Sequence, residues 1–262
     1  MPIHPIAAIT GASAGIGAEF ARQLAAKGYD LVLAARRLDA LDRLAGEIRA
    51  KCAVSVETIA ADLTKDDDVA SLGRKLASME GLSLLVNNAG FGARGLFFEA
   101  DAAQQEAMHR LHVLATERLT RAALPGMIAR RSGGVINVAS VAAFIQSPGN
   151  VCYCATKAWM VSFTEGLYLE LQRIGSPVTV QALCPGYTYS EFHDVMGVNR
   201  AKIMGASWWY PADFVVRESL RGFERRKLYV VPGMRYRAIV AAAKLLPHRL
   251  VLQATRRGRM PR

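Results

Sequence analysis

Residues 6–17 read IAAITGASAGIG, and this stretch decides the fold. A short aliphatic run ends at Thr10 and passes into a turn with glycine at positions 11, 15 and 17. The run has the composition of a buried β-strand, and apolar residues at helical spacing over 17–28 predict a helix that ends on Gly28. A strand that enters a helix through such a turn indicates the first unit of a parallel α/β sheet.

The same alternation of strand and helix continues along the chain. Short apolar runs predict strands, and longer amphipathic segments, such as 38–51, fill the gaps between them. The sequence therefore predicts an α/β fold, a Rossmann-like, doubly wound parallel sheet of about seven strands with helices on both faces. The expected strands are 6–10, 31–35, 54–60, 84–86, 135–138, 178–183 and 228–231.

Length and composition favour one folded domain. Of the 262 residues, 52% are hydrophobic and 21% are charged, unlike the low-apolar composition of disordered chains. The apolar runs are shorter than the roughly 18 residues that a membrane span needs. The beginning, MPIHPIAAITG, lacks the pattern of a secretory signal, so we expect a cytoplasmic protein whose four cysteines are reduced.

The net charge of +11 is concentrated at the C-terminal end. Residues 221–262 hold twelve Lys and Arg against one acidic residue, whereas residues 1–220 hold equal numbers of each sign. This end lacks a nucleic-acid recognition motif, and basic runs are usually solvated faces. We therefore expect no nucleic-acid partner.

The glycine-rich turn suits a pyrophosphate. Gly11 permits the tight turn, and Gly15 and Gly17 let the backbone approach an anion. Ile16 lies at the start of the helix, whose N-terminal N–H groups and dipole attract negative charge. The G-x-x-x-G-x-G spacing differs from the general dinucleotide-binding fingerprint, so a plain flexible turn is the alternative when the motif is taken alone.

The end of the second strand indicates which dinucleotide is bound. Arg36 and Arg37 stand where NAD-binding folds place an acidic residue for the ribose 2′-hydroxyl. Guanidinium groups suit a 2′-phosphate, and Ser13 can add a hydroxyl, so we expect NADP(H). Two solvated arginines are the alternative interpretation.

Residues after the third and fourth strands extend the expected cofactor site. Asp62, with Leu63 beside it, is placed to meet the adenine amino group. The fourth strand runs into Asn88, Ala89 and Gly90, and a side-chain amide at this point can brace the neighbouring backbone.

A serine, a tyrosine and a lysine follow the fifth strand. Ser140 comes directly after it, Tyr153 thirteen residues later, and Lys157 four after that. The spacing of four places Tyr153 and Lys157 on one helical face. Alone, such a pair is usually surface decoration, but after a strand-end serine in a dinucleotide-binding fold it predicts acid–base chemistry.

Four motifs, in this order and at these intervals, resemble the short-chain dehydrogenase/reductase family: TGASAGIG, NNAG, the strand-end serine with YCATK, and CPG. The resemblance implies an NADP(H)-dependent oxidoreductase that interconverts a carbonyl and a secondary alcohol. It also implies that Tyr153 exchanges the proton on oxygen and that Ser140 hydrogen-bonds the substrate oxygen. Lys157 would stabilise the phenolate and hold the nicotinamide ribose.

The resemblance implies a turn over the nicotinamide at CPGYTYS. Pro185 and Gly186 fix this turn, Thr188 backs the carboxamide side, and Ser190 stands where relatives usually have threonine. The resemblance runs as far as Gly233. We therefore divide the chain into a single dinucleotide-binding and catalytic domain, 1–233, and a basic amphipathic C-terminal extension, 234–262.

One position departs from the family pattern. Relatives have an asparagine there, which holds a water joining the lysine to solvent, and this chain has His112. A histidine both donates and accepts hydrogen bonds, so an imidazole can relay protons at this position, and we place it in the catalytic set. His109 and His112 lack a third ligand nearby in sequence, so we expect no metal.

Aromatic and apolar residues indicate the substrate. Segment 191–211 is the expected substrate lid, and apolar lids usually serve apolar ligands. We therefore expect a bulky apolar carbonyl or alcohol: a fatty-acyl ketone, a steroid or an aromatic ketone. Packing in the core or between subunits is the alternative. The lid residues are Phe192, Met196, Met204, Trp208, Trp209 and Tyr210, and those expected to face them are Phe91, Leu96, Phe97 and Phe144.

The extension has two interpretations. It either lies on anionic lipid or packs on the domain, and Pro247 breaks its helix in both cases. Three functions stay open: a carbonyl reductase or alcohol dehydrogenase, a non-catalytic NADP-binding sensor or scaffold, and a lipid carbonyl reductase at a membrane surface. We expect a homo-oligomer, because helices like 102–130 and 151–174 pair subunits in many relatives. The expected lipid-facing stripe is Ile239, Val240, Ala243, Leu246, Leu250 and Val251.

Overall fold

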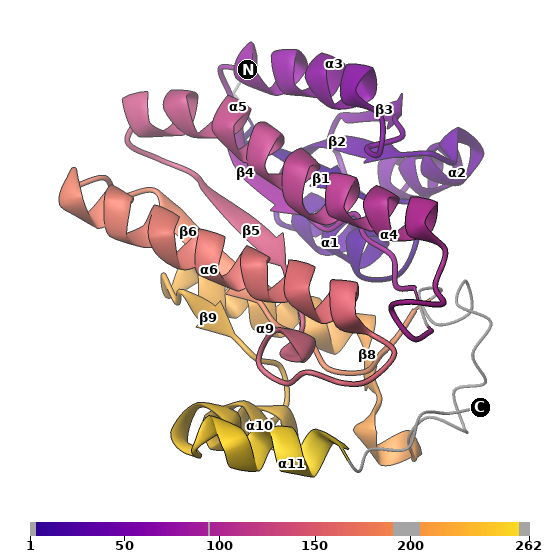
Figure 1. Cartoon of the computed structure of the whole chain (residues 1–262). Helices are drawn as coiled ribbons and strands as arrows, with labels where there is room; N and C mark the ends of the chain where they lie inside the picture. Colours follow the sequence, from indigo (N-terminus) through magenta and orange to yellow (C-terminus); the bar gives the residue numbers. More distant parts are fainter. Residues whose placement is uncertain (1–3, 94, 191–204, 257–262) are drawn as a thin grey trace.

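The computed structural model describes residues 4–93, 95–190 and 205–256, and a parallel sheet forms its centre (Figure 1). The strands of this sheet are β1 Ile6–Thr10, β2 Asp30–Ala35, β3 Val56–Ala60, β4 Leu82–Asn87, β5 Gly134–Val138, β6 Thr179–Leu183 and β9 Tyr229–Val230. They lie in the order β3-β2-β1-β4-β5-β6-β9, and all six pairings are parallel. The predicted seven-stranded, doubly wound sheet is confirmed.

Helices cover both faces of the sheet because the strand residues point alternately to each side. In β2, Leu31 and Leu33 pack into the core on one face, and Val32 and Ala34 pack into the core on the other. The first core is closed by α1 Gly15–Ala26, α2 Leu38–Arg49 and α9 Ala212–Glu224. The second is closed by α3 Asp66–Ala77, α5 Thr116–Ala129 and α6 Val151–Arg173, in front in Figure 1.

Helix α1 is fixed in place by its apolar face. Phe20 and Leu24 are fully buried against the sheet, and burial of each such side chain contributes roughly 1.5–3 kcal/mol. This packing holds the N-terminus of α1 at the carboxyl end of β1. The strand order reverses between β1 and β4, and in open parallel sheets this reversal is where ligands bind.

A π-helical turn at Arg110–Ala115 joins α4 Ala102–His109 to α5. The sequence pattern predicts one continuous helix over this region, and the widened turn is a finding of the structure. Turns of this kind are uncommon and occur often at functional sites. His112 lies within it.

The C-terminal extension forms two helices, α10 Met234–Leu245 and α11 His248–Arg256, on either side of Pro247. The predicted break is confirmed. Lys244 of α10 lies over the rings of Phe144 and Tyr229, 5.1 and 4.4 Å from their centroids. The extension therefore packs on the domain (Figure 1).

The expected lipid-facing stripe is only partly exposed. Val240 and Val251 are buried, and Ile239 lines an internal cavity. Leu246 and Leu250 are about half exposed. None of the helices within the described ranges is both long and apolar enough to span a bilayer.

Candidate active site

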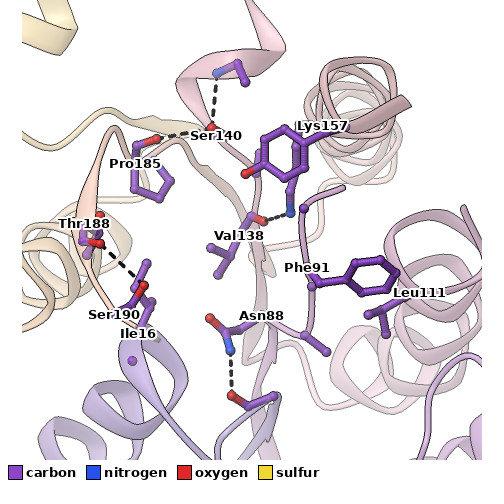
Figure 2. A pocket seen from close by; sticks show the side chains of 18 of the residues that line it. Ile16, Asn88, Phe91, Leu111, Val138, Ser140, Lys157, Pro185, Thr188 and Ser190 are labelled. Carbon is purple, nitrogen blue, oxygen red and sulfur yellow. Dashed lines mark hydrogen bonds between the residues drawn. The ribbon is translucent and has the colours of Figure 1, made fainter. Parts of the chain in front are cut away.

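A cavity of about 690 Å³ lies at the carboxyl ends of the strands, where the strand order reverses. One part, which we call the glycine half, is lined by 11, 13–16, 35–37, 61–64 and 88–90. The other part, which we call the aromatic half, is lined by Phe91, Tyr153, Tyr187, Trp208 and Tyr236. Ser140 and Lys157 also line the cavity, and Figure 2 shows both.

Most of the predicted site residues line this cavity. The exceptions are Gly17 and His112, which lie behind its wall. The predicted residues that the cavity brings together are Gly11, Ser13, Gly15, Ile16, Arg36, Asp62, Leu63, Asn88, Ala89, Gly90, Ser140, Tyr153, Lys157, Pro185, Gly186, Thr188 and Ser190.

Asn88 braces the glycine-rich turn. Its Nδ2 donates to the carbonyl oxygens of Thr10 and Gly11 at 2.9 and 3.1 Å (Figure 2). In return, Thr10 Oγ1 accepts hydrogen bonds from the backbone N–H groups of Asn88 and Ala89, each at 3.0 Å. These four bonds tie the end of β1 to the end of β4 and fix the shape of the turn.

Gly17 allows α1 to pack closely against the glycine-rich turn and Asn88. A Cβ atom at this position would lie 2.4 Å from the carbonyl oxygen of Gly11 and 2.5 Å from Asn88 Nδ2. Because neither group can move without breaking the braced turn, only glycine fits. The sequence interpretation gave Gly17 a direct approach to the pyrophosphate. In the structure this residue lies behind the turn, and Gly11 and Gly15 form the surface.

The far end of the glycine half carries charged groups. Arg36 and Arg37 line it, and Arg37 Nη2 donates to Ser13 Oγ at 3.2 Å. Asp62 lies on the same wall and accepts two hydrogen bonds from Thr64. Burial raises the pKa of Asp62, but the Thr64 bonds and nearby cations outweigh burial and hold this pKa below its usual value.

The groups of the glycine half fit a dinucleotide phosphate. Two guanidinium groups stand at one end, and the N-terminus of α1 points its N–H groups toward the cavity from the braced turn. A Cβ at Gly11 would lie 2.7 Å from the Ala89 Cα, so glycine is needed here for the turn to pack against the loop after β4.

Ser140 caps the short 3-10 helix Val141–Ala143. Its Oγ accepts from the backbone N–H of Ala142 at 3.1 Å and donates to the carbonyl oxygen of Pro185 at 3.5 Å (Figure 2). Ser140 also forms a hydrogen bond with the side chain of Tyr153. The hydroxyl is therefore held between the ends of β5 and β6, next to the tyrosine.

Tyr153 and Lys157 come from the first turns of α6, and burial favours the neutral form of both. It raises the pKa of Tyr153 to about 12, although the hydrogen bond with Ser140 acts in the opposite direction. Burial also lowers the pKa of Lys157 to about 7. Tyr153 therefore holds its proton at neutral pH.

The Lys157 ammonium is directed at neighbouring protein atoms. Its Nζ donates to the carbonyl oxygen of Val138 at 2.8 Å, as Figure 2 shows, and contacts Met160 Sδ at 3.4 Å. It lies 5.9 Å from the centre of the Tyr153 ring. The two residues are therefore close neighbours on the cavity wall.

His112 is fully buried and both of its ring nitrogens have partners. Nε2 accepts from the backbone N–H of Phe91 at 3.2 Å, so the neutral ring carries its hydrogen on Nδ1. Nδ1 lies 2.9 Å from Thr156 Oγ1, which donates to the carbonyl oxygen of Tyr153 at 3.0 Å. The imidazole therefore links the loop after β4 to the helix that carries the tyrosine.

In this geometry both ring nitrogens of His112 are engaged, which favours a bridging role over the expected proton relay. Burial, with smaller effects of Lys157 and His109, lowers the pKa of His112 well below 6.5. The ring stays neutral, and its one hydrogen and one lone pair are both used in fixed bonds. A relay would need one of these bonds to break. His112 acts as a buried bridge, and Phe91 and Tyr153 both lie within about 6 Å of its ring centre.

The aromatic half includes two residues that the sequence interpretation missed. Tyr236 and Ile239 of α10 line the cavity, although the extension was expected to be separate from the site. The available signal was weak: a single aromatic residue within MRYRAIVAAAKL. Because α10 returns to the site from a distant part of the chain, local pattern could not place it.

Other substrate expectations have mixed outcomes. Phe91 and Trp208 line the cavity, whereas Leu96 and Phe97 do not, and Phe97 is 60% exposed. Phe144 packs under Lys244 outside the cavity. Trp209 is buried against the rings of Tyr187 and Tyr189, and Tyr210 stacks on Phe214. The expected lid residues Phe192, Met196 and Met204 lie outside the described residues.

The four cysteines are all free, and Cys152, Cys154 and Cys184 are buried. Within the ranges that the structure describes, no three His, Cys, Asp or Glu side chains come together as metal ligands.

Comparison with known protein families identifies the family of this chain. A family model described as short chain dehydrogenase matches residues 5–199, about three quarters of the chain. This range includes the glycine-rich turn and all three polar residues on the cavity wall.

Three solved structures resemble the whole chain. A short-chain dehydrogenase from Sphingobium yanoikuyae in complex with NADPH is 33% identical, with a TM-score of 0.84 and 98% of both chains covered. A bulky-bulky ketone specific alcohol dehydrogenase from Comamonas testosteroni is 30% identical, with a TM-score of 0.79, over 98% of this chain and 96% of that one. A short chain dehydrogenase/reductase from Burkholderia phymatum in complex with NAD is 28% identical, with a TM-score of 0.82, over 99% and 96%.

Proposed function

This chain belongs to the short-chain dehydrogenase family, and we propose that it is an NADP(H)-dependent oxidoreductase that interconverts a bulky apolar ketone and its secondary alcohol. The observation that carries this proposal is the convergence of Ser140, Tyr153 and Lys157 on one cavity wall, next to a braced anion-binding turn. Members of an oxidoreductase family with this wall intact have the groups that carbonyl reduction requires.

The side chains divide the chemistry between them. A nicotinamide held in the cavity supplies or accepts the hydride. Tyr153, which holds its proton at neutral pH, protonates the oxygen of the developing alkoxide. Ser140 Oγ accepts from Ala142 and donates to Pro185 at a distance of 3.5 Å, so its hydrogen can turn to the same oxygen and stabilise its charge. Lys157 Nζ lies beside the tyrosine, and its protonated form favours the phenolate when the proton must return.

The choice of NADP(H) is supported by the two arginines. Arg36 and Arg37 line the glycine half, and a guanidinium pairs well with a 2′-phosphate. Among the relatives, the Sphingobium structure holds NADPH and the Burkholderia structure holds NAD. A nicotinamide dinucleotide is common to both, and the arginines are what favours the phosphorylated form here.

The substrate class is supported by the lining of the aromatic half. Phe91, Tyr187, Trp208 and Tyr236 give a wide apolar surface beside the polar wall. The relative from Comamonas testosteroni is specific for bulky-bulky ketones, and the alignment with it covers almost the whole chain.

The test is a screen followed by one substitution. NADPH oxidation is measured with an aryl ketone (propiophenone), a steroid ketone and a 3-oxoacyl thioester, and with butan-2-one as the small comparison. We expect turnover of at least one bulky ketone, and Tyr153→Phe lowers its kcat roughly 10²–10⁴-fold because the proton donor is lost. Tyr168→Phe, on the same helix but outside the cavity, is the matched control.

Two outcomes would contradict the proposal. Ketone-dependent oxidation that survives Tyr153→Phe undiminished would show that another group moves the proton. Tight NADPH binding without turnover of any carbonyl would favour a non-catalytic sensor or scaffold with the same fold.

A peripheral contact with anionic lipid and self-association are further parts of the proposal. Leu245 is 84% exposed, and Leu246 and Leu250 are about half exposed beside Arg249, which supports a membrane contact of α10 and α11. Exposed Leu169 of α6 supports a homo-oligomer. Co-sedimentation with anionic vesicles tests the first, and sedimentation velocity tests the second. Removal of all residues after 233 would also remove Tyr236 from the site, so substitution of Leu245 by Ser is the cleaner variant.

A further inference from the structure

The hydroxyl of Tyr236 joins two segments that flank residues 191–204. It donates to the carbonyl oxygen of Trp208 at 2.7 Å and accepts from the backbone N–H of Tyr187 at 3.0 Å. The side chain is 4% exposed and lines the cavity. One buried oxygen therefore links the turn at Tyr187 to the short helix Ala206–Trp208, in addition to the hydrogen bond that Tyr210 N–H donates to the Tyr187 carbonyl oxygen at 3.0 Å.

The ring of Tyr236 packs on the same turn. A Cβ atom at Gly186 would lie between 2.1 and 2.4 Å from three atoms of this ring. Glycine at 186 thus leaves the space into which the ring inserts. The ring also meets Trp208 and Tyr210 at interplanar angles of 67° and 61°, with centroids 5.9 Å apart in both pairs. Edge-to-face pairs of this kind are favourable beyond simple burial.

The residues on either side of Tyr236 hold α10 in place through contacts that do not depend on the Tyr236 hydroxyl. Arg235 Nη1 donates to the carbonyl oxygen of Ser207 at 2.8 Å. Arg237 donates to Glu218 Oε2 at 2.7 Å and to the carbonyl oxygen of Val231 at 2.9 Å. Because these contacts do not involve the Tyr236 hydroxyl, its removal leaves the helix and the ring where they are.

We propose that Tyr236 is a specificity-determining residue of the substrate site, whose hydroxyl holds Tyr187 and Trp208 at a fixed spacing and so shapes the aromatic half for a bulky apolar ketone. This inference rests on the proposed function. The hydroxyl acts by positioning: its hydrogen is already donated to Trp208, and burial raises the pKa of Tyr236 to about 12.

The test is Tyr236→Phe in the full chain. This change keeps the ring against Gly186 and removes both hydrogen bonds. We expect KM for propiophenone to rise roughly fivefold to thirtyfold, as the loss of two hydrogen bonds would give. KM for butan-2-one, which does not reach Trp208, stays within about twofold, and so does kcat for both ketones, because Tyr153 and Ser140 are untouched.

Hydrogen–deuterium exchange gives a second measurement that needs no turnover. The Tyr187 amide loses its acceptor in Tyr236→Phe, so exchange over residues 184–190 becomes faster, while exchange over 10–17 is unchanged. Tyr229→Phe is the matched control: its ring lies against Lys244 of the same helix, and the residue is outside the cavity. It should change neither KM nor exchange.

The outcomes separate the inference from the proposed function. If wild type reduces none of the ketones in the screen, the proposed function fails and the specificity role fails with it, while the exchange result still decides whether the hydroxyl fixes the turn. If wild type reduces both ketones but Tyr236→Phe raises KM equally for both, or for neither, the specificity role is wrong. Unchanged exchange over 184–190 would show that the two hydrogen bonds do not fix this turn.

Discussion

The two halves of the cavity are built in different ways. The glycine half is made of short segments that each follow a strand, and its shape is fixed by backbone groups such as the carbonyls of Thr10 and Gly11. The aromatic half is made of single side chains from separate segments, and two of these segments are linked by one hydroxyl, that of Tyr236. Backbone-built sites tolerate little change, whereas a site made of side chains can be altered one contact at a time.

This difference has a functional consequence. A cofactor shared by many enzymes needs the same phosphate and ribose contacts each time, which a braced backbone provides. Substrates differ, and specificity needs parts that vary without disturbing the sheet. We therefore expect substitutions in the glycine half to affect every substrate, and substitutions in the aromatic half to affect only some.

The largest effect is expected from Gly17→Ala. The added Cβ would come within 2.4 Å of the Gly11 carbonyl oxygen, so the braced turn must shift. We expect NADPH affinity, measured by fluorescence titration, to fall roughly 100-fold, with a lower Tm and with losses that are equal for all ketones. Gly46→Ala is the control, because it is exposed on α2 with open space around it and should leave affinity unchanged. Normal NADPH binding by Gly17→Ala would show that the glycine half tolerates change as the aromatic half does.

The next largest effect is expected on the preference between NADPH and NADH. Arg36→Asp replaces a guanidinium of the glycine half by a carboxylate, which repels a 2′-phosphate. The ratio of kcat/KM with NADPH to that with NADH should fall roughly 10- to 100-fold, and the order of preference among ketones should not change. Arg43→Asp, on the solvent face of α2, is the control. An unchanged ratio would remove Arg36 from this role.

A smaller effect is expected in the pH dependence of stability. Between pH 7 and 10.5, the unfolded chain keeps a proton on Lys157 that the folded chain has lost, since burial lowers this pKa from 10.5 to about 7. Stability of the cofactor-free protein therefore rises with pH in this window. We expect Lys157→Met to reduce the rise in unfolding free energy between pH 7 and 9 by about 2 kcal/mol, measured by urea denaturation. An identical rise in the variant would show that Lys157 is charged in the folded state.

The smallest effect on catalysis is expected from His112→Asn. The imidazole lies behind the wall and bridges Phe91 to Thr156, so kcat should stay within about threefold and the pH profile should not change. The shorter side chain cannot reach both partners, and we expect unfolding free energy to fall by about 1–3 kcal/mol. An inactive but folded variant would show that the reaction depends on the imidazole after all.

The sequence was most informative where the chemistry lies within a few residues of a strand end. All seven strands of the sheet could be predicted because their apolar runs are short and separated by helices. The glycine-rich turn, Asn88 and the Ser140, Tyr153 and Lys157 set could be assigned to one cavity for the same reason. In a parallel sheet, the ends of neighbouring strands meet at one edge, whatever the rest of the chain does.

The sequence was least informative where a residue's role depends on contacts with residues far away in the chain. Gly17 follows the pattern of a phosphate-binding glycine, yet its hydrogen is needed for packing against Gly11. His112 suggests a proton relay by its position, and its two hydrogen bonds show a bridge. The apolar stripe that suggested a lipid surface faces the protein at Val240 and Val251.

By itself the sequence determined the fold, the family and the position of the polar wall, because periodicity and short motifs act through neighbouring residues. Only the tertiary structure decided that the C-terminal helix belongs to the site. Tyr236 contacts Tyr187 and Trp208 because α10 packs back across the end of the sheet. Contacts between side chains so far apart in the chain depend on how whole elements pack, which a local pattern does not record.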